Sequence, residues 1–158
     1  MEWLAGLPAA LQGSGFAAWA RGPAYAWINV GHLLGLVLLV GGIGVLDLRL
    51  AGLGRGVSPA ALARLVTPFA VAGLLVAAAT GSGLFAADAV ALSGSATFRW
   101  KLLLVALGLA NAVLFRAVWQ SRLDGWDDRP SAAGRLVAIS SLAIWLAVGT
   151  LGRMIAYT

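Results

Sequence analysis

Long hydrophobic runs separated by short polar stretches dominate the chain. The runs cover approximately residues 24–50, 62–87, 98–119 and 136–157. Each is long enough for an α-helix that crosses the hydrocarbon core of a bilayer, which takes about 20 residues. Gly, Pro and Asp favour loops at 52–59 (GLGRGVSP) and 125–130 (GWDDRP), and residues 88–97 form the third connection. The pattern predicts an all-α integral membrane four-helix bundle, a single membrane domain over residues 1–158.

The N-terminal segment has a different pattern. Residues 2–20 are too polar, and too broken by Pro8 and two glycines, to cross a membrane. Their apolar side chains suit a short helical segment that lies in the membrane interface: Trp3, Leu4, Leu7, Leu11, Phe16 and Trp19. The chain starts with an acidic residue and lacks the hydrophobic run of a signal peptide, so we expect the segment to be retained.

Composition narrows the class of protein. Hydrophobic residues make up 61% of the chain, charged residues 11%, and the mean hydropathy is +0.91, values that exclude a water-soluble domain. The net charge of +5 does not indicate nucleic-acid binding, because the basic residues stand between hydrophobic runs. With no Cys and one His, thiolate metal sites and any multi-histidine centre within one copy are excluded.

The distribution of basic residues predicts the orientation. Cytoplasmic loops of membrane proteins carry the excess of Lys and Arg. Seven arginines belong to the side of the 52–59 and 125–130 loops: Arg49, Arg55, Arg64, Arg116, Arg122, Arg129 and Arg135. The other side carries Arg21, Arg99, Lys101 and Arg153. We therefore expect a multi-pass protein of the bacterial inner membrane with both termini periplasmic, and Trp119 and Trp126 in the inner aromatic belt.

Polar groups in the outer half of the runs form the candidate site. His32 lies about 12 Å along the first helix at 1.5 Å per residue, and Thr80, Lys101 and Arg153 reach similar depths. Ionisable residues at membrane depth are expensive and indicate function. If these groups face inward, they form a basic pocket with one imidazole, and we expect it to bind a cofactor through all four residues, with His32 as the metal ligand.

Haem b is the cofactor that this set suggests first. The imidazole of His32 suits the iron, and Lys101 or Arg153 suits the propionates. The chain offers no second histidine, and Met1 and Met154 are its only other candidate iron ligands. A five-coordinate haem or His32 of a symmetric partner removes the need for a second ligand from the same chain. The predicted role is non-catalytic, as an electron-transfer or accessory subunit. The alternatives for His32 are a packing hydrogen bond, for instance with Thr80, and a proton relay.

Polar residues of the inner half are interpreted as architecture. Asp47 is expected to pair with Arg64 or Arg116 of a neighbouring helix. Interhelical hydrogen bonds are expected from three residues: Asn111, Ser140 and Ser141. Gly31 and Gly35 form a small-residue pair that lets helices approach closely. No nucleophile, base and orienting group occur together, so a hydrolase is not expected.

The sequence also resembles a known family. The elements that carry the resemblance are GHLLGLVLLVGGIGVLDLRLAGLG, TPFAVAGLLVAAATGSGLF, FRWKLLLVALGLANA and SLAIWLAVGTLGRMIAY. They are similar to a family of small four-span bacterial inner-membrane proteins without an assigned function, and distantly to the membrane domain of CopD-type copper-resistance proteins. The second likeness implies copper or ion handling as an alternative function, although Met and His are scarce here. A purely structural subunit, in a homo-oligomer or a larger membrane complex, is the third alternative.

Overall fold

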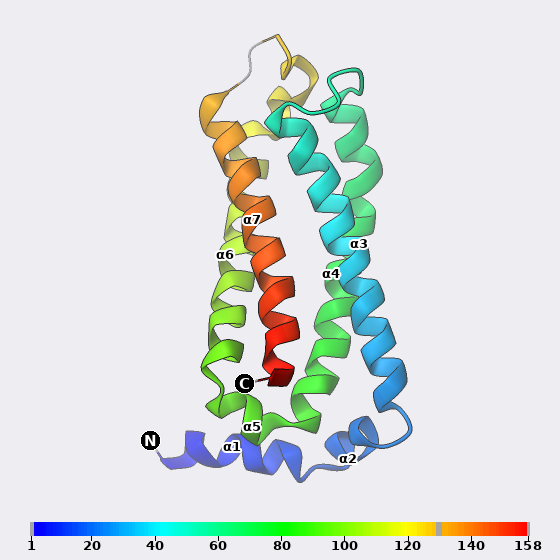
Figure 1. Ribbon diagram of the computed structural model, residues 1–158, viewed down its shortest axis with the longest axis vertical. Coiled ribbons are helices and arrows are strands. Elements are labelled where there is room, and N and C mark those ends of the chain that lie inside the picture. The colour runs from blue at the N-terminus through cyan, green and yellow to red at the C-terminus, as the bar shows by residue number, and fades with distance from the viewer. Residues whose placement is uncertain (1, 129–130, 158) are drawn as a thin grey trace.

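Four long helices form the body of the molecule. In the computed structural model (Figure 1) they are α3 (Tyr25–Ala51), α4 (Pro59–Ala87), α6 (Ala96–Trp119) and α7 (Ala132–Met154). All four are long and apolar enough to cross a membrane. The shorter elements are α1 (Glu2–Gln12), α2 (Gly15–Arg21), α5 (Ala89–Gly94) and two 3₁₀ turns, η1 (Gln120–Gly125) and η2 (Ile155–Tyr157). The described residues contain no strand, and the predicted all-α membrane bundle is confirmed.

The structure describes the backbone of residues 2–128 and 131–157, and the side chains of residues 6–128 and 131–157. The predictions that involve Trp3, Leu4 and Arg129 therefore lie outside the described side chains.

Serine caps set where three of the long helices begin. Ser58 accepts a hydrogen bond from the backbone N–H of Ala61, and Pro59 occupies the first turn, where its missing N–H costs nothing. Helix α4 therefore starts within the stretch 52–59 that the sequence suggested as loop. Ser95 and Ser131 cap α6 and α7 in the same way.

The connection at residues 88–97 and the N-terminal segment also differ from what the sequence predicted. The stretch 88–97 contains the short helix α5, because its run of Ala, Val and Leu favours a helical turn once Asp88 has ended α4. Pro8 lies inside α1, and the N-terminal segment is broken instead at residues 13–14, before Ser14 caps α2.

The long helices are arranged as two hairpins. Helix α3 packs most extensively on α4, α6 packs on α7, and the hairpins meet through α3 and α7. A Cβ atom at Gly35 would lie 2.7 Å from the backbone nitrogen of Ala77, and one at Gly73 would lie 2.6 Å from the carbonyl oxygen of Gly35. Close approach of α3 and α4 thus depends on glycine, as the small-residue pair predicted.

The N-terminal helices cover one end of the bundle. Figure 1 shows α1 and α2 lying across the long helices at the end that also holds both chain termini. We name this the terminal end, and the opposite end, with residues 52–58 and 120–131, the loop end. Leu7, Phe16 and Trp19 remain about half exposed on α1 and α2, as an interfacial segment requires.

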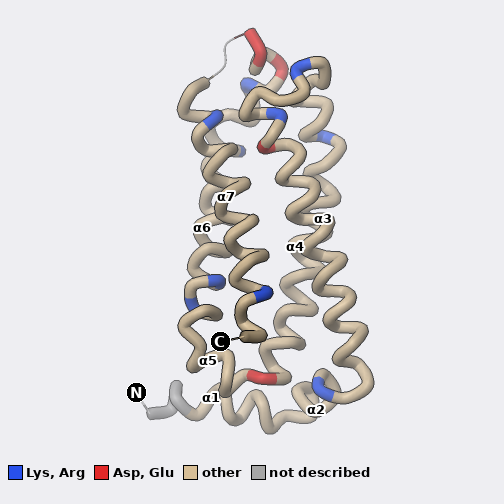
Figure 2. Tube along the Cα trace, viewed as in Figure 1, with Lys and Arg blue, Asp and Glu red and all other residues tan. Residues whose placement is uncertain are grey.

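The outer surface of the bundle is apolar. Large hydrophobic side chains remain exposed along all four long helices, among them Leu33, Val37, Leu75, Val113 and Ile139. Figure 2 shows charged residues mainly toward the two ends, with an uncharged zone between them. Contact with the lipid tails of a bilayer accounts for both features, since a soluble protein rarely exposes apolar surface on this scale.

Candidate functional site

His32 is held against α4 in the terminal half of the bundle. Its Nδ1 atom lies 3.0 Å from the carbonyl oxygen of Ala77 and 3.2 Å from Oγ1 of Thr80. A carbonyl oxygen only accepts, so Nδ1 carries the hydrogen and donates it. Nε2 then retains its lone pair and is the ring nitrogen that is free to bind a ligand.

Glycines make room for this arrangement. A Cβ at Gly81 would lie 3.1 Å from Cε1 of His32, so the imidazole rests directly on the backbone of α4. A Cβ at Gly31 would lie 3.0 Å from Cγ2 of Thr80. Thr80 in turn donates its hydroxyl hydrogen to the carbonyl oxygen of Val76, at 2.6 Å. The imidazole orientation is therefore fixed by small residues and by two oxygen atoms of α4.

The basic residues predicted to accompany His32 have different surroundings. Lys101 is partly buried, and its Nζ atom lies close to helix α7. A Cβ atom added at Gly152 would be 3.3 Å from this Nζ. Arg153 is exposed and donates from Nη2 to the hydroxyl of Tyr157 at 2.7 Å. The structure thus brings His32 and Thr80 together, whereas Lys101 lies against Gly152 of α7 and the guanidinium of Arg153 is engaged by Tyr157.

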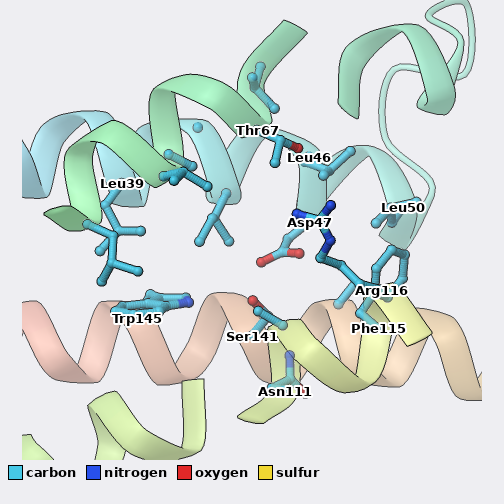
Figure 3. A pocket seen from close by; sticks show the side chains of 18 of the residues that line it. Leu39, Leu46, Asp47, Leu50, Thr67, Asn111, Phe115, Arg116, Ser141 and Trp145 are labelled. Atoms are coloured by element: carbon cyan, nitrogen blue, oxygen red, sulfur yellow. The ribbon is translucent and has the colours of Figure 1, made fainter. Parts of the chain in front are cut away.

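A second group of polar residues surrounds a cavity nearer the loop end. The cavity has a volume of about 160 Å³ and is lined by residues from all four long helices. Figure 3 shows Asp47, Ser141 and Trp145 directed toward its interior. All three side chains are buried, with exposures of 6%, 5% and 2%. Neither Oδ2 of Asp47 nor Nε1 of Trp145 has a hydrogen-bond partner.

The expected pairing of Asp47 is wrong. In the described part of the chain, neither Arg64 nor Arg116 forms an ion pair with it. Helix α3 directs Asp47 toward the centre of the bundle, whereas Arg64 is exposed, as long basic side chains near helix ends commonly are. Arg116 lines the same cavity but does not come within ion-pair distance, so Asp47 has no ion-pair partner in the described residues.

Interhelical hydrogen bonding is confirmed in part. Nδ2 of Asn111 on α6 donates to the carbonyl oxygen of Val137 on α7 at 3.2 Å. Ser141 lines the cavity, and Ser140 points outward with an exposed side chain. Of the three residues assigned to helix packing, Asn111 therefore has that role and Ser141 belongs to the cavity.

Arg49 closes the loop end. It is 3% exposed, donates from Nε to the carbonyl oxygen of Val57 and from Nη2 to that of Arg55, and forms an ion pair with Asp127. This pair joins the two loops at that end. The hydrogen bond from Arg49 holds the pKa of the exposed Asp127 carboxyl below its usual value.

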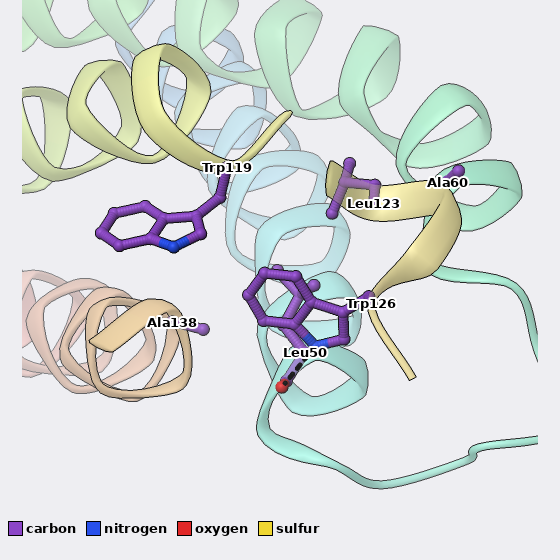
Figure 4. Close-up of a cluster of buried hydrophobic side chains, with 6 residues drawn as sticks. All are labelled: Leu50, Ala60, Trp119, Leu123, Trp126 and Ala138. Atoms are coloured by element: carbon purple, nitrogen blue, oxygen red, sulfur yellow. Dashed lines mark hydrogen bonds between the residues drawn. The ribbon is translucent and has the colours of Figure 1, made fainter. Parts of the chain in front are cut away.

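Trp119 and Trp126 are core residues rather than members of an interfacial belt. They are 8% and 2% exposed and pack with Leu50 and Leu123 in one buried cluster (Figure 4). Nε1 of Trp126 donates to the carbonyl oxygen of Leu50 at 3.2 Å. The prediction placed both indoles at the lipid interface from their position near helix ends. It was wrong because η1 folds this connection back over the bundle.

One signal in the sequence pointed to the cavity. Asp47 is an acidic residue inside a hydrophobic run, and Trp145 lies in the middle of another run, away from either membrane interface. Both positions are unusual for their residue types. The sequence does not show that the two side chains share one space, because that depends on how the hairpins pack.

Comparison of the chain with known proteins identifies no relative. No family model, no curated protein and no solved structure matches the chain. The described residues also contain no group of three or more His, Asp or Glu side chains that could hold a metal ion.

Proposed function

We propose that this multi-pass membrane protein binds haem b, or a similar metal-containing cofactor, at His32 as a non-catalytic electron-transfer or accessory subunit. The hydrogen bond from Nδ1 to the carbonyl oxygen of Ala77 supports the proposal most directly. Histidines that bind metals commonly donate their other ring N–H to a carbonyl, which fixes the ring and leaves Nε2 as the ligand.

One histidine and one lysine of this half of the bundle suit a haem. Nε2 of His32 would hold the iron, and the ammonium group of Lys101 would suit a propionate. Bound haem would supply one-electron exchange at the iron. Neither the cavity at Asp47 nor the hollow at Trp100 and Thr150 is lined by His32. The proposal therefore places the macrocycle at an open face of the bundle, five-coordinate or shared with a second copy.

The cellular location belongs to the same proposal. The excess of arginine on the side of the loop end supports an orientation with this end in the cytoplasm and both termini in the periplasm. A cofactor at His32 would then lie in the periplasmic half of a bacterial inner membrane. Cysteine-accessibility labelling from either side of the membrane tests the orientation.

The decisive experiment compares absorption spectra after haem reconstitution. His32→Asn retains a donor at the position of Nδ1 and removes Nε2, so the packing hydrogen bond is kept while the ligand is lost. Thr80→Val is the matched control, because it alters the same contact and leaves Nε2 intact. We expect a Soret band in wild type and in Thr80→Val, and none in His32→Asn. Wild-type protein that stays colourless in oxidised and reduced form would overturn the proposal.

A structural role for His32 is the second candidate. The two hydrogen bonds to α4 favour it, since each adds to helix packing whether or not a cofactor binds. It predicts colourless protein, a stability that falls with His32→Ala but not with His32→Asn, and a co-purifying membrane partner. Copper handling, the remaining alternative, predicts bound copper that is lost in both His32 variants.

A further inference from the structure

The cavity near the loop end contains two buried polar atoms of opposite type without partners. Oδ2 of Asp47 is an acceptor and Nε1 of Trp145 is a donor. Native proteins pair nearly all buried polar groups, and an exception needs an explanation. Figure 3 shows both groups directed into the same space, with the hydroxyl of Ser141 between them. A ligand that fills the space would satisfy both.

The charge balance favours a cation. A buried carboxylate that has one oxygen atom without a partner is costly inside a membrane, and a positive charge compensates it best. The basic side chains nearby do not provide that charge: Arg49 is bound to Asp127, and Arg116 lines the cavity but forms no ion pair with Asp47 in the described structure. The rings of Trp145 and Phe115 add aromatic walls, which attract organic cations.

The volume and the walls limit the size of the ligand. A cavity of about 150 Å³ in another protein holds one benzene molecule, so the 160 Å³ found here takes a molecule of about six to eight non-hydrogen atoms. Apart from the polar groups named above, most of the lining is aliphatic, with residues such as Leu39, Ile43 and Leu74. A short hydrocarbon chain fits that surface.

We propose that this cavity is a binding site for a small organic amine, held through its ammonium group by Asp47 and Ser141. An oxygen atom at the other end of the molecule would accept the hydrogen of Trp145 Nε1. The preferred ligand is therefore a short amino alcohol, followed by a plain alkylamine, with a neutral alcohol of equal length the weakest.

The packing indicates the route of access. Toward the loop end the cavity is lined by Leu50, which packs against Trp119 and Trp126. Helix α4 packs against α3 but has no comparable contact with α6 or α7 in the described residues. A ligand that dissolves in the membrane enters between α4 and α6.

The test uses three probes of matched length: 4-amino-1-butanol, pentylamine and 1-pentanol. Binding to the full-length protein in lipid nanodiscs is measured by calorimetry. We expect both amines to bind at least about tenfold more tightly than pentanol, which is the effect of one charged hydrogen bond. Asp47→Asn should abolish this preference, while Asp127→Asn, which changes a carboxylate outside the cavity, should leave it intact.

A second variant tests the opposite end of the ligand. Trp145→Phe keeps the aromatic wall and removes Nε1, so it should weaken aminobutanol about fivefold and leave pentylamine unchanged. Equal affinity for pentanol and pentylamine, an unchanged preference in Asp47→Asn, or no binding of any probe would overturn the proposal. If Asp47→Asn does not fold, the wild-type probe ranking and Trp145→Phe still decide it. His32 has no part in this test, because it lies 15 residues, or about 22 Å, along α3 from Asp47.

Discussion

The middle of the bundle and its loop end are held together by different means. In the middle, α3 and α4 touch backbone to backbone through Gly35 and Gly73, and His32 adds hydrogen bonds to α4 toward the terminal end. At the loop end, side chains from distant parts of the sequence pack together: Arg49 binds Asp127, and Trp126 donates to the carbonyl oxygen of Leu50. The first region depends on the absence of side chains and the second on large ones.

This difference in packing determines where each half of the bundle has space for a ligand. Tight packing between α3 and α4 leaves no room behind His32, so a ligand there must approach from the Nε2 side. Next to the indole cluster of the loop end, residues of all four long helices surround a cavity around Asp47. The proposed cofactor site therefore lies at the surface of the bundle, whereas the proposed amine site lies among its four long helices.

The largest expected effect on stability lies at the loop end. Trp126→Ala removes an indole that is 2% exposed together with its hydrogen bond to Leu50, and should lower the free energy of unfolding by about 3–5 kcal/mol. Trp27→Ala is the control, since that indole is 77% exposed. Thermal unfolding followed by circular dichroism in detergent measures both. Equal losses in the two variants would show that the cluster does not stabilise this end.

A smaller effect on the free energy of unfolding is expected where the backbones of α3 and α4 meet. Gly35→Ala places a Cβ 2.7 Å from the nitrogen of Ala77, and forcing α3 and α4 apart should cost about 1–3 kcal/mol. Gly41→Ala on the same helix has nothing within 4 Å of the added atom and should be neutral. The same unfolding measurement compares them. If both substitutions prove neutral, the close approach of α3 and α4 does not matter for stability.

The ion pair of the loop end should respond to acid. Because Arg49 lowers the pKa of Asp127 in the folded state, the pair contributes its full stability above the unfolded pKa of about 3.9 and loses it as pH falls through the lower folded value. Asp127→Asn should therefore lower the melting temperature at pH 7 and make little difference at pH 2. If the melting temperature of Asp127→Asn differs from that of wild type by the same amount at pH 7 and at pH 2, this role is contradicted.

The smallest effect is expected for His32→Asn. The asparagine amide can still donate to the carbonyl oxygen of Ala77, so the free energy of unfolding should change by less than about 0.6 kcal/mol, the average value of an interhelical hydrogen bond. His32→Leu removes the donor and should cost more. Chemical unfolding in mixed micelles separates the two. A large loss in His32→Asn would mean that the imidazole packs in a way that its amide substitute cannot reproduce.

The sequence predicts much of the fold because membrane helices follow from local hydrophobicity. The four helices and the glycine contact between α3 and α4 follow from runs and spacings within single segments. The contact of His32 with Thr80 was also among the expected alternatives, since both lie at the same depth.

The remaining contacts depend on how segments distant in the sequence pack together. Asp47 was expected to find an arginine because membrane charges usually pair, yet rotation of α3 about its axis directs it into the cavity instead. Arg49 pairs with Asp127, which lies 78 positions further along the chain, and no periodicity of the sequence indicates such a pair. Trp119 and Trp126 were assigned from position alone, and the fold of η1 decides their burial.

The central claim is that the two halves bind different ligands through His32 and Asp47. A haem titration of wild type, His32→Asn and Asp47→Asn, followed by the Soret absorbance, tests it most directly. We expect saturable binding in wild type and in Asp47→Asn, and none in His32→Asn. Equal absorbance in wild type and His32→Asn, or no binding by wild type, would contradict the claim.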